Sequence, residues 1–340
     1  RPILSHENEQ VFDVPGLDDA TWIYPNSGES GYYTWTLPSE HSARLTQHAT
    51  RALSLTERLG FLEATALSVE SGEISVADVL RVAQTFLTDP EPQVRLAAAV
   101  RITSACEIYF TKEDRPLAVR GIRRLLRPVL DTIGFERKDG EPRTIEPLRA
   151  SLLSALGTHG QDSEIIEYCR SEANRQLNDP RSVDAGIAQV VLDVASWNGD
   201  AEWADRLREA FEKTDAPDVR TRFLIAIGRF QNPELARAAM DYSLTDAVKP
   251  NEMQDLHSAT YGLADVRLEW LMKNYDAVKS KVPQDSLPYW VSKLSGAEPD
   301  VLEKGRAFFL DPARKNQLTE VELTKLVEAC ELRYELRTRN

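Results

Sequence analysis

From about residue 40 onward, apolar residues recur at every third or fourth position along the chain. In residues 75–86, 187–194 and 219–230, valine, isoleucine and phenylalanine follow this spacing. It is the period of an α-helix that buries one face. Start signals agree with it, because Ser54 is followed three residues later by Glu57, as in a capping box. The pattern predicts roughly fourteen to sixteen helices of about 10–18 residues, joined by short links.

Helices this short, without a heptad repeat, indicate stacked helical hairpins rather than a bundle or a coiled coil. No repeat signature of about 34 or 40 residues recurs cleanly, so the hairpins are predicted to be irregular and HEAT-like. The polar stretch 134–147 is interpreted as an exposed loop and not as a domain boundary. Residues 39–340 are therefore predicted to form one mostly α domain, an α-α superhelix shaped like a bowl.

Residues 1–38 follow a different pattern. "EQVFDVPGL" alternates apolar and polar residues, and "TWIYPNSGESGYYTW", residues 21–35, flanks a turn sequence with aromatic and β-branched residues. This is typical of a β-hairpin. Two or three strands cannot bury a sheet face alone, so they are expected to pack on the first helices. The predicted contacts are Trp22, Tyr24, Tyr33 and Trp35, with about half of them pointing away.

Composition narrows the function classes. The chain has 340 residues, 42% of them hydrophobic, and a formal charge of −13, which argues against a nucleic-acid-binding protein. The three cysteines form no CxxC pair, so a zinc ribbon is not indicated. No apolar run is long enough to predict a membrane span. The start lacks both an initiator methionine and a signal peptide, so the chain is expected to be cut from a longer one. The compartment stays open between the cytoplasm, a bacterial periplasm and secretion.

Candidate catalytic motifs are incomplete. "HENEQ", residues 6–10, has glutamine where the zinc motif HExxH needs its second histidine, and "GESGYY", residues 28–33, lacks the last glycine of GxSxG. His41 and His48 have no carboxylate ligand between them on that helix face, and His159 is interpreted as a residue at a helix end. We therefore expect no active site and no cofactor in this chain.

Several segments resemble one family in order and spacing. "PNSGESGYY", residues 25–33, is similar to the end of a small β-sandwich domain in zinc aminopeptidases of the aminopeptidase N type, with Thr34 where the family has arginine. That family includes the puromycin-sensitive and the endoplasmic-reticulum aminopeptidases. Residues 55–91, 146–163 and 216–244 resemble its helical segments, and so does "RLEWLMKNYDAVKSKVP". Neither HExxH nor the family's GxMEN motif appears in the chain.

The resemblance implies that residues 1–38 are the last strands of a truncated β-sandwich and that residues 39–340 are the helical C-terminal domain. The parent enzyme would remove N-terminal residues from peptides, with zinc in an upstream catalytic domain. The helical bowl would cover that site and bind or gate peptides. Its partners would be its own upstream domains and peptide substrates. The alternative is a non-catalytic HEAT-like scaffold or a degenerate, aminopeptidase-like adaptor.

Cationic residues opposite the apolar stripe of a helix are the candidates for contact with peptide. Guanidinium groups suit the planar carboxylate at the end of a peptide. The alternative is that these residues pair with neighbouring carboxylates such as Asp218 or Glu269. The candidates are Arg149, Arg220, Arg222, Arg267 and Lys273.

Overall fold

The computed structural model describes residues 22–111, 113–260, 262–314 and 317–339. Within these ranges the chain is mostly α-helical and has no strand, which confirms the predicted helical class. Its HEAT-like character stays a prediction. The helices are α1 (Ser39–Ala52), α2 (Leu55–Glu70), α3 (Val76–Phe86), α4 (Pro92–Tyr109), α5 (Arg115–Ile133), α6 (Ile145–Thr158), α7 (Ser163–Asn178), α8 (Ala188–Trp197), α9 (Ala201–Lys213), α10 (Pro217–Ile227), α11 (Pro233–Tyr242), α12 (Met253–Ala259), α13 (Ala264–Lys281), α14 (Pro299–Phe309) and α15 (Gln317–Arg339), with 3-10 helices η1 (Ser27–Glu29) and η2 (Gln284–Leu294).

Local capping starts several helices where the sequence predicts. Ser54 accepts a hydrogen bond from the Glu57 amide, and Ser75 accepts one from the Asp78 amide, so both capping boxes form. Most of the loop predicted at residues 134–147 is present, but it ends at residue 144 because α6 begins at Ile145. Local sequence signals therefore place these boundaries.

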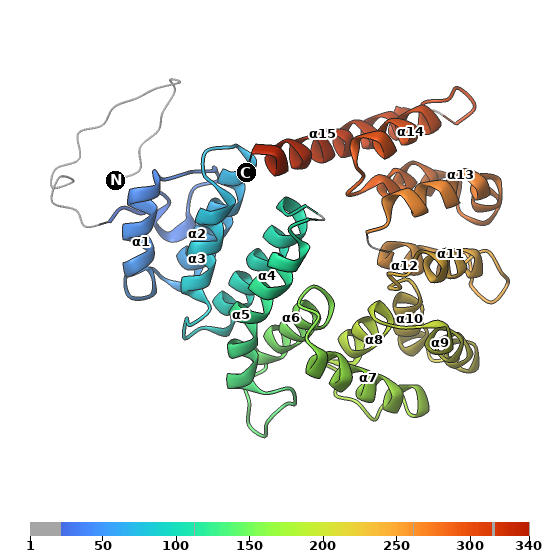
Figure 1. Ribbon diagram of the computed structural model, residues 1–340, viewed down its shortest axis with the longest axis horizontal. Helices are drawn as coiled ribbons and strands as arrows, with labels where there is room; N and C mark the ends of the chain where they lie inside the picture. Colours follow the sequence, from blue (N-terminus) through green and yellow to red (C-terminus); the bar gives the residue numbers. More distant parts are fainter. Residues whose placement is uncertain (1–21, 112, 261, 315–316, 340) are drawn as a thin grey trace.

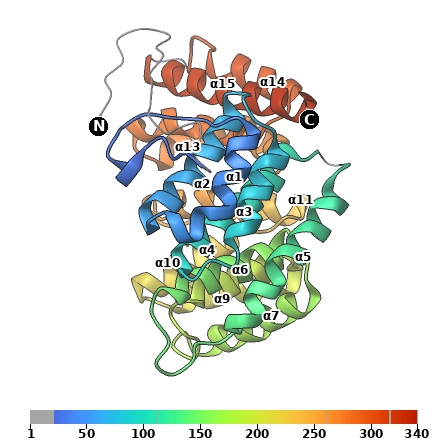
Figure 2. The same cartoon turned by 90° about the vertical axis from the view of Figure 1, so that its left-hand side faces the viewer.

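The helices follow one another around a ring (Figure 1). The helices α4, α6, α8, α10 and α12 form an inner row in which each helix packs on the next one. The intervening helices α5, α7 and α9 pack against this row. Figure 2 shows α14 and α15 at the opposite end of the molecule from α7.

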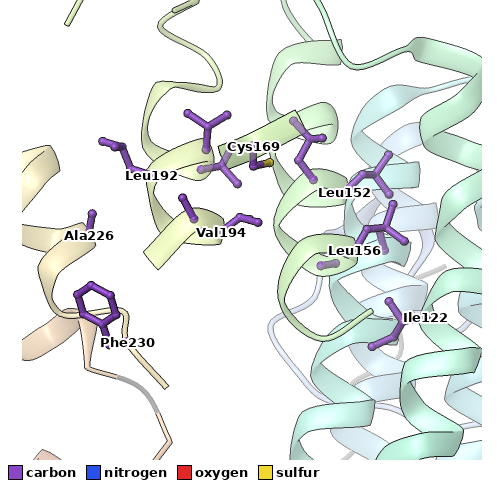
Figure 3. Close-up of a cluster of buried hydrophobic side chains, with 14 of the residues drawn as sticks. Ile122, Leu152, Leu156, Cys169, Leu192, Val194, Ala226 and Phe230 are labelled. Carbon is purple, nitrogen blue, oxygen red and sulfur yellow. The ribbon is translucent and has the colours of Figure 1, made fainter. Parts of the chain in front are cut away.

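The hydrophobic core runs between successive helices of the inner row. In Figure 3, Leu156 of α6 lies toward Ile122 of α5, whereas Val194 of α8 lies on the opposite side of α6, near Cys169. All four side chains are fully buried. Helices α6 and α8 approach closely at Gly157, where an added Cβ would lie 2.5 Å from a methyl carbon of Val194. Glycine at this position therefore sets the spacing between α6 and α8.

The predicted β-hairpin is not formed in the part of the segment that the structure describes. Residues 22–38 contain the short helix η1 and extended coil, with no strand. The Asn26 side chain closes the turn instead, since its Oδ1 accepts from the Gly31 amide at 2.9 Å and its Nδ2 donates to the Gly31 carbonyl at 3.1 Å. The side chain thus takes backbone groups that a strand ladder would use. The strand predicted in "EQVFDVPGL" lies outside the described residues.

The segment before α1 nevertheless packs on the first helices, as predicted. Trp22, Tyr24 and Trp35 are partly buried against the core, while Tyr33 is 55% exposed. The Trp35 ring stacks on Phe61 of α2 with a centroid separation of 6.0 Å. Aromatic packing on α2, and not a sheet, therefore holds this segment.

Helix α15 brings the end of the chain back to its first helices (Figure 1). Arg337 donates from Nε to the carbonyl of Ile108, at the end of α4, at 2.7 Å. Leu336 is buried in a small cluster with Val69 and Val76. The described helices thus close into a ring.

Candidate functional site

The ring has a cavity of about 600 Å³ on its inner side. Its wall combines residues that are far apart in sequence, including Glu107 of α4, Ile122 of α5, Trp197 of α8 and Arg337 of α15. The turns that follow α6, α8, α10 and α12 all lie at or beside this wall, because the inner helices end there. The cavity is therefore a product of ring closure. We refer to it below as the interior cavity.

Paired charges and aromatic rings line the interior cavity. His159, the C-cap residue of α6, lies 2.6 Å from Glu107, measured from Nε2 to Oε1, and its ring meets Trp197 edge-on at 5.2 Å. In the adjoining space, Arg229 pairs with Asp193 at 3.2 Å. Burial raises the pKa of Asp193, and the Arg229 charge opposes that effect. His159 thus bonds to a carboxylate as well as ending its helix.

The interior cavity has binding groups but no evident nucleophile. Cys106 lines it, yet burial raises the pKa of this thiol to about 11, so the thiol stays protonated near neutral pH. Within the described ranges, no group of three or more histidine, cysteine or carboxylate side chains is arranged to hold a metal ion. The incomplete HExxH motif at residues 6–10 lies outside those ranges. Such a wall can bind a polar chain, but no catalytic step can be assigned to it.

Two of the predicted peptide-contacting residues are buried in the fold. Arg149 is 1% exposed, donates from Nε to the Gly134 carbonyl at 3.0 Å, and pairs with Glu141 at 2.5 Å. Arg267 is 5% exposed and donates to the carbonyl of Ser295 at 2.6 Å. Both guanidinium groups join one helix to the end of another. Their contact with peptide stays a prediction.

The other three candidates lie nearer to solvent. Arg220 makes a two-pronged pair with Glu252, at 2.9 and 3.1 Å, and Arg222 pairs with Asp218 at 2.9 Å within α10. The pairing of Arg222 with Asp218 is the alternative given above, in which a candidate pairs with a neighbouring carboxylate. Lys273 is exposed on α13. None of the five candidates is among the described residues that line the interior cavity, so the structure does not bring them together there.

Sequence reasoning missed the cationic residues that do line the interior cavity. Arg115, at the start of α5, is exposed, and its side chain has no hydrogen bond or ion pair among the described residues. Arg337 lines the opposite side and pairs with Glu298 at 3.1 Å. The two arginines are too far apart in sequence for any local pattern to unite them. The one described lining residue that the sequence singles out is His159, which is interpreted there as a residue at a helix end.

Comparison with known proteins gives a family match over most of the chain. A family model described as "ERAP1-like C-terminal domain" matches residues 22–329. Among curated proteins, the chain is 23% identical to aminopeptidase M1-A of Oryza sativa subsp. japonica over 310 residues, which cover 85% of this chain and 34% of that protein.

Two further relatives come from distant organisms. The puromycin-sensitive aminopeptidase of Caenorhabditis elegans is 21% identical, over 76% of this chain and 27% of that protein. Aminopeptidase 2, mitochondrial, of Saccharomyces cerevisiae is 20% identical, over 78% and 28% respectively. The chain thus spans about a third or less of the length of the relatives it matches. None of the described helices is both long and apolar enough to cross a membrane.

Proposed function

This chain belongs to the family of ERAP1-like C-terminal domains, and we propose that it is the helical C-terminal domain of a zinc aminopeptidase. The observation that carries the proposal is the match over residues 22–329, together with relatives that are aminopeptidases. The parent enzyme removes N-terminal residues from peptides. Zinc bound in an upstream domain would supply a Lewis acid for the scissile carbonyl and for the attacking water. In this proposal the metal and the catalytic groups belong to that upstream domain.

The role of this domain is to cover the active site and bind the part of the peptide that extends away from the metal. The interior cavity supports this role, because its wall carries both aromatic rings and charged groups. A peptide offers amide groups and apolar side chains to such a wall. Arg115 is the side chain whose guanidinium is free to meet a peptide carboxylate. A ring with this interior admits an extended peptide more readily than a folded protein.

The test uses the full-length parent enzyme with two kinds of substrate. We expect Arg115→Ala to raise KM for a long peptide about three- to tenfold and to leave an aminoacyl-amide reporter unchanged. The reporter has no distant carboxylate to lose. Arg120→Ala is the matched control, because Arg120 is exposed on the same helix but does not line the interior cavity.

Two outcomes would overturn parts of the proposal. If Arg115→Ala and Arg120→Ala have equal KM values for the long peptide, the proposal that the interior cavity binds peptide is wrong. A parent protein without chelator-sensitive aminopeptidase activity would instead identify the chain as part of a non-catalytic, aminopeptidase-like adaptor.

A further inference from the structure

A second cavity lies apart from the interior cavity, between α12, η2 and α15. Its volume is about 740 Å³, and it shares no lining residue with the interior cavity. Tyr289, Trp290 and Leu326 supply an apolar wall, and His257 and Lys293 are polar lining residues that are almost fully buried. A cavity of this size suits a small organic ligand. We call it the α12–α15 cavity.

Lys293 has no counter-charge beside it, among the described residues, that would hold its buried amine in the ammonium form. The side chain is 3% exposed, and Nζ donates to the His257 carbonyl at 2.7 Å and to the Thr260 hydroxyl at 3.2 Å. An ammonium group has three N–H donors, and no carboxylate pairs with Lys293 among the described residues. The Trp290 ring, 5.4 Å away, offers only its π face. Burying a cation without a counter-charge is unfavourable, so an anion beside Nζ would stabilise it.

His257 supplies a complementary acceptor. The Ser243 hydroxyl donates its one hydrogen to the Met240 carbonyl at 2.6 Å, so it must accept from Nε2 of His257, which lies 2.9 Å away. Burial lowers the pKa of His257, which keeps the ring neutral. Nδ1 is then a bare acceptor, and no described donor reaches it. The ring is held between Trp270 and Trp290, with centroids 5.0 and 4.7 Å away.

We propose that the α12–α15 cavity binds a small organic acid in which a hydrogen-bond donor stands next to the carboxylate, as in a 2-hydroxy acid with an apolar side chain. The carboxylate accepts from Lys293, and the adjacent donor bonds to Nδ1 of His257. The apolar body lies against Trp290 and Leu326. One ligand thus satisfies both buried groups.

Charge supports an anion over a neutral ligand. Burial and the nearby Arg267 guanidinium lower the pKa of Lys293. A carboxylate in contact with Nζ offsets both effects, because an opposite charge favours the ammonium form. Lys325, the other lysine on the wall, is 67% exposed and already paired with Glu322 at 3.0 Å. Lys293 is therefore the lysine that recognises the anion.

The experiment titrates the 340-residue chain with 3-phenyllactate by calorimetry. We expect saturable binding that weakens at least about tenfold with 3-phenyllactamide, which lacks the charge, or with 3-phenylpropionate, which lacks the hydroxyl. N-acetylphenylalanine offers the same two groups as the end of a peptide. If N-acetylphenylalanine binds more tightly, the site recognises the C-terminal end of a peptide. If 3-phenyllactate binds more tightly, the site recognises a free organic acid. Either result supports carboxylate recognition.

Three variants locate the binding site, each checked by its melting curve. Lys293→Met should weaken binding of 3-phenyllactate at least about tenfold, and Lys325→Met should leave it within about twofold. Ala329→Trp fills the cavity from an exposed position on α15 and should abolish binding while the buried donors stay in place. Absence of binding to the wild-type chain, or equal binding of acid and amide, would overturn the proposal.

Discussion

Three arginines extend from one helix to the backbone carbonyls at the end of another helix. Arg149 reaches the end of α5, Arg220 donates to the carbonyl of Phe211 at the end of α9 at 3.2 Å, and Arg267 donates to Thr260, which follows α12, at 3.2 Å. The last carbonyls of a helix have no partner within it. At the residue scale, these arginines therefore supply C-terminal capping between helices.

The Arg149–Glu141 pair gives the first prediction. We expect Arg149→Met to lower the free energy of unfolding by about 3 kcal/mol or more, because Glu141 and the α5 carbonyls lose a buried partner. The measurement is urea denaturation followed by circular dichroism. Adding Glu141→Gln to this variant should recover part of the lost stability. Arg222→Met is the control, because the carboxylate that pairs with Arg222 is exposed to solvent, and it should change the urea midpoint little. Equal effects of Arg149→Met and Arg222→Met would contradict this reading.

Glu252 gives a prediction about pH. The Arg220 hydrogen bond holds the pKa of Glu252 below its ordinary value of 4.5. A carboxylate whose pKa is lower in the folded state than in the unfolded state stabilises the fold. This contribution is fully present above the unfolded-state pKa and is lost as pH falls through the folded-state pKa. The stability gap between wild type and Glu252→Gln should therefore be large at about pH 7 and shrink toward about pH 3. A gap that stays constant in denaturation curves over this range would refute the linkage.

At the scale of elements, Glu57 joins the first segment to α2. Its carboxylate accepts from the Ser54 amide, as a cap, and also from the Gly28 amide, both at 2.8 Å. Its own carbonyl accepts from the Tyr24 hydroxyl at 2.9 Å. The same residue that starts the helix therefore also anchors the turn before it.

Two helical glycines give a matched prediction about helix spacing. Gly157→Ala places a Cβ 2.5 Å from Val194, so we expect it to destabilise the chain by about 1–3 kcal/mol. Gly121→Ala meets nothing within 4 Å and should stabilise α5 by up to about 1 kcal/mol. Thermal melting of both variants checks the contrast. We expect the two changes in melting temperature to have opposite signs. If both substitutions stabilise the chain, the contact between α6 and α8 is not as tight as proposed.

At the scale of the whole molecule, α15 determines whether the chain is an open arc or a ring. Arg337 bonds to Ile108, which lies 229 positions earlier, and Leu336 completes a buried cluster with Val69, Val76 and Val79. They hold α15 in the place where its Tyr334 and Arg337 form part of the wall of the interior cavity. Loss of the α15 docking would therefore open that cavity while leaving the contacts among the inner-row helices in place.

Leu336→Ala is the corresponding test. We expect it to lower stability by about 2–3 kcal/mol and to speed amide hydrogen exchange in α3, while α10 keeps its protection. Thr324→Ala, at an exposed position of the same helix, is the control. Uniform acceleration in both α3 and α10 would mean that α15 stabilises the whole fold rather than closing the ring.

The sequence by itself determined the helical class and several helix boundaries, because apolar spacing and capping boxes such as Ser54–Glu57 act within one or two turns of chain. It also indicated the family, from motifs spread over most of the chain. It predicted a β-hairpin at residues 21–35 that is not formed in the described part of that segment, because aromatic alternation cannot tell a strand from coil that packs on a helix. Tertiary structure alone decided that Arg149 is buried, that α15 closes the ring, and that Lys293 meets His257 in one cavity. Those partners come together through helix packing over long sequence separations, which no local pattern records.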